Sequence, residues 1–203
     1  MRLRHSALTL ALLASTAAYA QMGGPPAAPA PGTVVAPAVS MDAAVTQLQS
    51  LWTGAASAMP ADKYSFAPSA DMFKTPSSVQ FTGVRTFAQL VTHTVQANFM
   101  YWSFASGLKP DFDVASIPKM TNKEDIVKAA KASMEFGHKA AATITPANAF
   151  EAVRGRPGAT RITAIAGGVI HLRDEYGQMV EYLRLNGLVP PASEGKPLAN
   201  PAK

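Results

Sequence analysis

Apolar residues recur at every third or fourth position in four separate segments of the chain, with polar residues between them. This period places the apolar side chains on one face of an α-helix, whereas a half-buried strand would alternate at every second position. The pattern predicts helices over residues 41–59, 86–106, 121–144 and 163–186. Four helices of this length, each with one apolar stripe, predict an all-α fold and favour a four-helix bundle.

Two pairs of residues mark the expected starts of the second and third helices. Thr86 with Gln89, and Thr121 with Glu124, have the spacing of a capping box. In this motif each of the two side chains bonds the backbone N–H of the other residue. We therefore expect both helices to begin directly after these threonines.

The connection between the first two helices is the longest in the predicted domain. It follows Pro60, which ends the first helix because proline cannot donate the next helical hydrogen bond. A connection over residues 60–85 is long for a compact domain, and such connections are typically functional or mobile. We expect Tyr64 and Phe66 to fix its first part on the helices.

The first twenty residues have the three parts of a secretory signal peptide. Residues 1–5 are positively charged, residues 6–18 are largely apolar, and Ala18-Tyr19-Ala20 fits a small-x-small cleavage site. We expect cleavage after Ala20 and a periplasmic or extracellular location. An uncleaved anchor is the alternative, but the apolar run is shorter than the ~20 residues of a spanning helix. We expect no stable membrane insertion after cleavage.

Composition divides the rest of the chain into three parts. Residues 21–40 are rich in Pro and Ala and carry no charge, which predicts an extended linker. Residues 41–189 hold the four helical segments and form the predicted folded domain. Residues 190–203 are again rich in Pro and predict a flexible tail.

Charge and cysteine content exclude several classes of function. The chain has no cysteine, which excludes disulfide scaffolds, iron–sulfur clusters and thiol nucleophiles. Its formal net charge of +5 falls by two when Arg2 and Arg4 leave with the signal peptide. The basic residues are scattered, so we expect no nucleic-acid partner. The chain also lacks a phosphate loop and a dinucleotide fingerprint.

Two helix faces carry residues that are suited to chemistry. His93 lies within the apolar stripe of the second helix. On the fourth helix, His171 and Glu175 are four residues apart and therefore share a face. One turn earlier come Gly167 and Gly168, and a glycine inside a helix costs roughly 1 kcal/mol relative to Ala. Either a second helix approaches closely there, or a small pocket opens above His171, lined by Gly168, Tyr176 and Tyr182.

Other polar and aromatic residues have simpler interpretations. His138 has no acidic residue four positions away and is expected to be solvated. The segment 154–158 is basic and rich in Gly, and it is interpreted as a turn, with an anion contact as the minor alternative. Four aromatic residues are expected in the core or in a pocket wall: Trp52, Tyr101, Trp102 and Tyr176.

Three stretches of the chain resemble the DinB-like family, in particular its secreted members. They are Trp52 with MPADKYSFAP (59–68), RTFAQLVTHTVQANF (85–99) and HLRDEYGQMVEYLRLNGLVPPAS (171–193). The resemblance covers about residues 44–193. It implies a four-helix bundle with a non-standard helix order and long crossover connections, of which 60–85 would be one.

The resemblance also implies a divalent metal ion, usually held by three histidines at one end of the bundle. His93 matches the first ligand, and His171 matches the first residue of an H-x-x-x-H pair. Glu175 replaces the last histidine. Two His and one carboxylate form a known ligand set for zinc, nickel, iron or manganese. The alternative is a site that no longer binds metal, where the three residues form a structural ion-paired cluster.

Two kinds of function agree with the resemblance. The first is an exported metal-dependent enzyme, a transferase or a hydrolase. The second is a non-catalytic helical protein that binds a small-molecule ligand or a partner and retains a vestigial metal site. The resemblance also implies a homodimer as a candidate assembly.

Overall fold

The computed structural model describes residues 28–74, 80–155 and 157–195. The chain divides into two compact units, Met1–Val35 and Ala36–Lys203. In the first unit, residues 28–35 contain a turn in which the Thr33 amide donates to the Ala30 carbonyl over 3.1 Å. The predicted signal peptide and residues 21–27 of the predicted linker lie outside the described residues.

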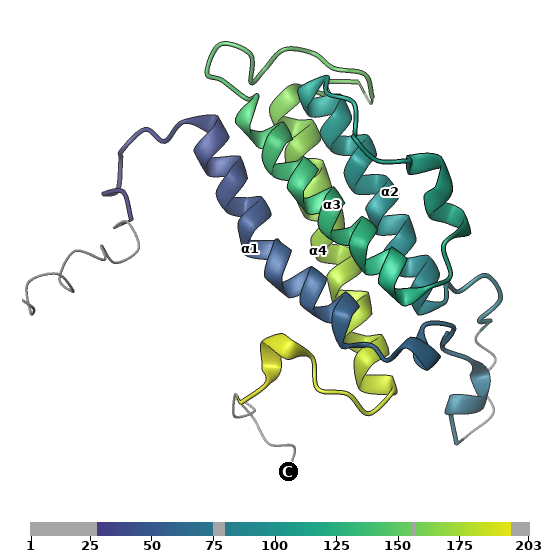
Figure 1. Ribbon diagram of the computed structural model, residues 1–203. Helices are drawn as coiled ribbons and strands as arrows, with labels where there is room; N and C mark the ends of the chain where they lie inside the picture. The colour runs from purple at the N-terminus through teal and green to yellow at the C-terminus, as the bar shows by residue number, and fades with distance from the viewer. Residues whose placement is uncertain (1–27, 75–79, 156, 196–203) are drawn as a thin grey trace, which may run out of the picture. The chain divides into compact units, whose positions relative to one another are not determined.

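Four α-helices make up most of the second unit (Figure 1). They lie within four residues of the predicted segments at every end. Among the described residues the only strand-like feature is an isolated bridge between Ala152 and Thr160, so the all-α prediction is confirmed. The helices are α1 (Pro37–Ala58), α2 (Phe87–Ser106), α3 (Lys123–Ala142) and α4 (Arg161–Leu185), with short 3-10 helices η1 (Ala61–Lys63), η2 (Ala70–Met72), η3 (Val114–Lys119) and η4 (Pro191–Ser193).

Helix ends differ from the predictions where local caps compete. The capping box of Thr86 and Gln89 is present at α2. The box predicted at Thr121 is wrong, because the side chain of Asn122 accepts from two backbone amides and caps α3 instead. Helix α1 begins at Pro37, inside the predicted linker, because proline suits the first turn of a helix.

The C-terminal segment is also more structured than the sequence suggested. Pro190 is buried, and η4 packs against α1. A Cβ on Gly54 of α1 would lie 3.8 Å from Pro191 Cβ, which is ordinary van der Waals contact. The first residues of the predicted tail are therefore part of the packed unit.

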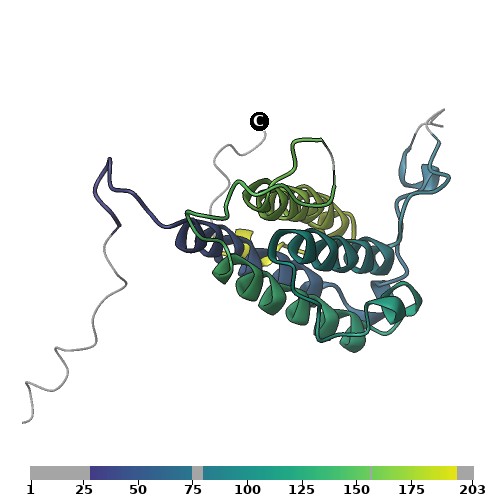
Figure 2. The ribbon, with the colours of Figure 1, turned by 90° about the horizontal axis from the view of Figure 1, so that it is seen from above.

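Each of α1 and α2 packs mainly against α3 and α4, which lie on opposite sides (Figure 2). Lys123 at the start of α3 donates to the carbonyl of Ser57 at the end of α1, so these two helices are antiparallel. Tyr182 near the end of α4 donates to the carbonyl of Arg85 just before α2, so α2 and α4 are also antiparallel.

Helices α2 and α3 are parallel neighbours. Asn98 of α2 donates to Ser133 of α3. Four residues further along both helices, Trp102 lies against Gly137. Two parallel neighbours need a connection that returns along the length of the helices. Residues 107–122 provide it through η3, which packs on α2.

The connection over residues 60–85 has a different role from the one predicted. It joins the end of α1 to the start of α2 at the same end of the unit, so it does not run along the helices. Its first part is fixed as expected, because the Tyr64 hydroxyl donates to the carbonyl of Ala56 and Phe66 packs edge-on against Tyr182.

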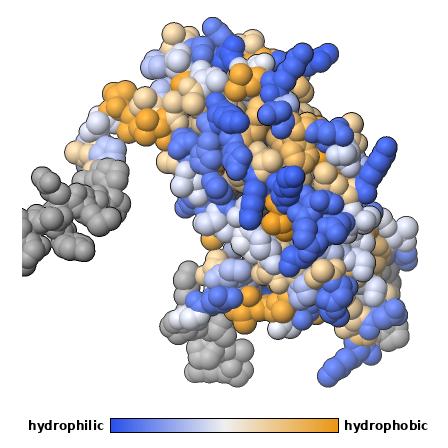
Figure 3. Space-filling view, viewed as in Figure 1, coloured by the Kyte–Doolittle hydropathy of each residue, from blue (hydrophilic) through white to orange (hydrophobic). Residues whose placement is uncertain are grey.

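Helix α3 presents one face to solvent. Lys128, Lys131, Glu135 and Lys139 are exposed at helical spacing, and Figure 3 shows a largely hydrophilic surface over this helix. Within the described residues, no helix combines the length and the apolar character that a membrane span requires.

Candidate metal centre

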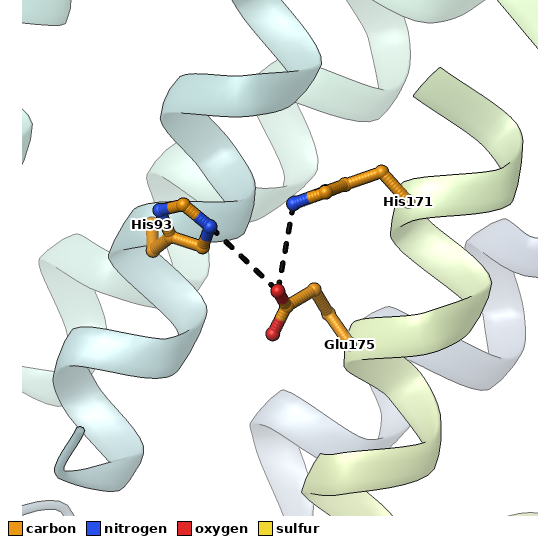
Figure 4. A group of neighbouring side chains, drawn as sticks. All are labelled: His93, His171 and Glu175. Atoms are coloured by element: carbon orange, nitrogen blue, oxygen red, sulfur yellow. Dashed lines mark ion pairs between the residues drawn. The ribbon is translucent and has the colours of Figure 1, made fainter. Parts of the chain in front are cut away.

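Three side chains predicted as metal ligands meet between α2 and α4 (Figure 4). His93 comes from the second turn of α2. His171 and Glu175 are one turn apart on α4 and point from the same face. The antiparallel packing of the two helices brings His93 to the level of this pair, so the structure gathers the three residues as expected.

The distances between the donor atoms suit a single ion. Nε2 of His93 lies 3.6 Å from Oε1 of Glu175, and Nε2 of His171 lies 3.4 Å from the same oxygen. One donor atom from each of the three residues lies within 4.8 Å of the others. Metal–ligand bonds of about 2.0–2.2 Å in a tetrahedron separate neighbouring donors by about 3.4 Å. Both measured edges are close to this value.

The three side chains differ in their access to solvent. The side chain of Glu175 is 6% exposed, that of His171 is 23% exposed and that of His93 is 37% exposed. The carboxylate therefore lies at the base of the group, and the His93 imidazole lies at its open side. A small molecule can reach the group from the side of His93.

Burial disfavours charge on all three groups. It raises the pKa of Glu175, although the positive charge of Arg85 acts in the opposite direction. It lowers the pKa of His93 and of His171, and Arg85 lowers both further. The lowered pKa values of the histidines favour the neutral imidazoles that bind metal, and a divalent cation beside Glu175 would favour its ionised form.

Neither oxygen of the Glu175 carboxylate has a good hydrogen-bond partner among the described residues. Oε2 of Glu175 is buried and has no hydrogen-bond partner among the described residues. The contacts of Oε1 with the two imidazoles, at 3.4 and 3.6 Å, are too long for good hydrogen bonds. A buried unpaired carboxylate is unfavourable, and a divalent cation between the three donors would satisfy it.

One feature departs from a well-supported metal site. A metal-ligating histidine usually donates its second ring nitrogen to a protein acceptor. Nδ1 of His171 is buried and has no partner in the part of the chain that the structure describes. The ring is held by packing instead, since Tyr101 lies against it with 6.0 Å between ring centroids.

The predicted small pocket above His171 is occupied by a side chain. A Cβ on Gly168 would lie 2.6 Å from Nε1 of Trp102, so Gly168 is required for close packing of α2 on α4. Tyr182 is buried, and its hydroxyl donates to Arg85. Tyr176 is half-buried against the hydrophobic core.

His138 is placed differently from its prediction. It is half-buried between α3 and α1, where Nδ1 lies 2.6 Å from Oδ1 of Asp42 and Nε2 lies 2.5 Å from Oε1 of Gln49. These partners are about ninety residues away in the chain, so no local spacing indicates them. Arg85, whose charge lowers the pKa of both site histidines, was not among the predicted site residues. Tyr101 was expected in the core or in a pocket wall, and the structure places its ring against that of His171.

The fold and the site together define an all-α protein whose helices gather a His/His/Glu group that could bind a metal ion. Comparison of the chain with family models, with curated proteins and with solved structures finds no match. The function is therefore inferred from the residues of the site.

Proposed function

We propose that the protein binds one divalent cation, zinc, nickel, iron or manganese, through His93, His171 and Glu175. The observation that carries this proposal is a buried, unpartnered carboxylate with two neutral imidazoles at the spacing of metal ligands. The open side at His93 leaves room for a further ligand. When bound, such an ion supplies Lewis acidity, which lowers the pKa of a coordinated water or thiol.

We also propose membership of the DinB-like family and export through the N-terminal leader. The sequence motifs support the family, and so does the packing of α1 against α3 and α4, since the resemblance implies a non-standard helix order. On this basis the protein is an exported metal-dependent transferase or hydrolase. Glu175 would neutralise part of the charge of the ion, and His93 would border the position where substrate enters.

A second function is favoured by one observation. His171 lacks the partner for Nδ1 that supports most ligating histidines. In this alternative the protein is a non-catalytic ligand- or partner-binding bundle with a vestigial site. Glu175 would then be protonated in the folded protein, as the upward shift of its pKa favours.

Elemental analysis of the mature protein, purified without a polyhistidine tag, separates the two functions. Metal binding predicts about one equivalent of divalent metal, lost in His93→Ala, His171→Ala and Glu175→Gln. His138→Ala is the matched control, because it removes an imidazole from another pair of helices. Metal-free protein that folds normally, both before and after each site substitution, would support the vestigial site.

A further inference from the structure

A cavity of about 510 Å³ lies between α2, the start of α4 and the segment before α4. Its walls include the apolar side chains of Met100, Tyr101, Phe104 and Pro157. Met100 is 46% exposed although it is a large apolar residue, so part of this surface is open to solvent. Cavities of this size and character hold small organic ligands.

The rim of the cavity carries a positive charge. Arg154 lines the cavity, is exposed and forms no ion pair with any described residue. The neighbouring cation, Arg161, is already engaged by the carboxylate of Glu151 and the carbonyl of Ala105. None of the described residues that line the cavity is acidic. As far as the described residues go, the cavity therefore combines apolar walls with one cation, Arg154, at its edge.

The segment that carries Arg154 is held in place by backbone contacts. The amide of Val153 donates to the carbonyl of Ala159 over 3.0 Å, and Ala152 pairs with Thr160. Gly158 has a φ of 79°, a left-handed conformation that favours glycine. The base of the loop that carries Arg154 is thus fixed by backbone pairing.

One wall of the cavity also contacts the candidate metal centre of His93, His171 and Glu175. Tyr101 lines the cavity and also lies against the ring of His171. A Cβ on Gly167, one turn before His171, would approach the Tyr101 ring to 3.3 Å. Gly167 therefore leaves room for the tyrosine ring between the cavity and the imidazole.

We infer that this cavity binds a small amphipathic anion, with its apolar body against Phe104 and Met100 and its acidic group on Arg154. The assignment of this molecule as the substrate of the proposed metal site rests on the proposed function. Tyr101 links the cavity to that site, because it lines the cavity and lies against His171. Binding itself requires no metal. Loss of metal and loss of anion binding are therefore separate outcomes.

Fluorescence titration with two related dyes tests the inference. Anilinonaphthalenesulfonate is an apolar anion, and N-phenylnaphthylamine is its neutral counterpart. We expect Arg154→Gln to weaken binding of the anion by about threefold to tenfold and to leave binding of the neutral dye unchanged. Arg173→Gln, an exposed substitution on α4 outside the cavity, is the control for net charge and should change neither affinity.

A second variant locates the bound dye. Met100→Glu places a carboxylate on the exposed wall and is expected to abolish binding of the anion, while dodecanoate should displace the anion from the unmodified protein. Glu175→Gln should bind the anion normally even if it has lost metal. Equal anion affinities of Arg154→Gln and Arg173→Gln, unchanged binding by Met100→Glu, or absence of anion binding to the unmodified protein would each overturn the inference.

Discussion

At the scale of single residues, Glu175 is the group that would set the ion preference of the proposed metal site. A carboxylate adds a negative charge and a hard oxygen donor, whereas histidine adds a neutral nitrogen. We expect Glu175→His to strengthen zinc or nickel binding relative to manganese by about tenfold or more. Competition titrations with a metal-sensitive dye measure this ratio. A ratio that is unchanged by the substitution would mean that the oxygen is not a ligand.

The pH dependence of stability follows from the same residues. The pKa of Glu175 is raised above 4.5, so metal-free protein loses stability as the pH rises above 4.5 and through the raised pKa. Glu175→Gln removes this loss. In the presence of a chelator, the variant should match the unmodified protein below pH 4.5 and exceed it in unfolding free energy near pH 7.

Urea unfolding at several pH values measures this difference. The two histidines have pKa values lowered from 6.5 by burial, so they remove stability as the pH falls below 6.5 in both proteins. With saturating metal the order should reverse, because the variant lacks one ligand. A difference that does not vary with pH in metal-free protein would contradict the burial of the carboxyl.

Sequence reasoning found the three ligand candidates because their positions are visible in one dimension. His171 and Glu175 share a helix face, and the resemblance supplied His93. It did not find the partners of His138, because these contacts depend on which helices become neighbours. Tyr101 was expected in the core or in a pocket wall, but its contact with His171 was not predicted. Arg85, just before α2, was not predicted either, because it acts on the pKa of Glu175 by its charge across space.

At the scale of helices, Trp102 sets the distance between three of them. Its ring lies over Gly137 of α3 and Gly168 of α4, where a Cβ would approach to 2.7 and 2.6 Å. Gly168→Ala should therefore destabilise the protein by about 1–3 kcal/mol through forced displacement of the ring. Thermal or urea unfolding measures this loss.

Gly177 is the matched control on the same helix. It is exposed, and a Cβ there would meet nothing within 4 Å. Gly177→Ala should stabilise the helix by about 0.5–1 kcal/mol. If Gly168→Ala raised the unfolding free energy as Gly177→Ala is expected to do, the close approach of Trp102 to α4 would be wrong.

His138 connects α1 to α3 through Asp42 and Gln49. We expect His138→Ala and Asp42→Ala to destabilise the protein with a coupling energy of about 0.5–1.5 kcal/mol in a double-mutant cycle. Asp125→Ala, which removes an exposed acid from α3, should show no coupling with His138→Ala. Additive effects at His138 and Asp42 would exclude the contact.

At the scale of the whole molecule, the helix pattern predicted the fold class but not the path of the chain. The four apolar stripes were sufficient for the all-α prediction, because each stripe must be buried. The return connection through η3 was not predicted, since a short 3-10 helix has too few turns to show a period. The parallel packing of α2 and α3 depends on that connection.

The most direct test of the central claim is a crystal structure with zinc, using anomalous scattering to locate the ion. The account predicts one strong peak about 2.0–2.2 Å from Nε2 of His93, Nε2 of His171 and Oε1 of Glu175, lost in crystals of Glu175→Gln. A structure of zinc-saturated crystals with no peak at these atoms, and with Glu175 hydrogen-bonded to an imidazole instead, would contradict it.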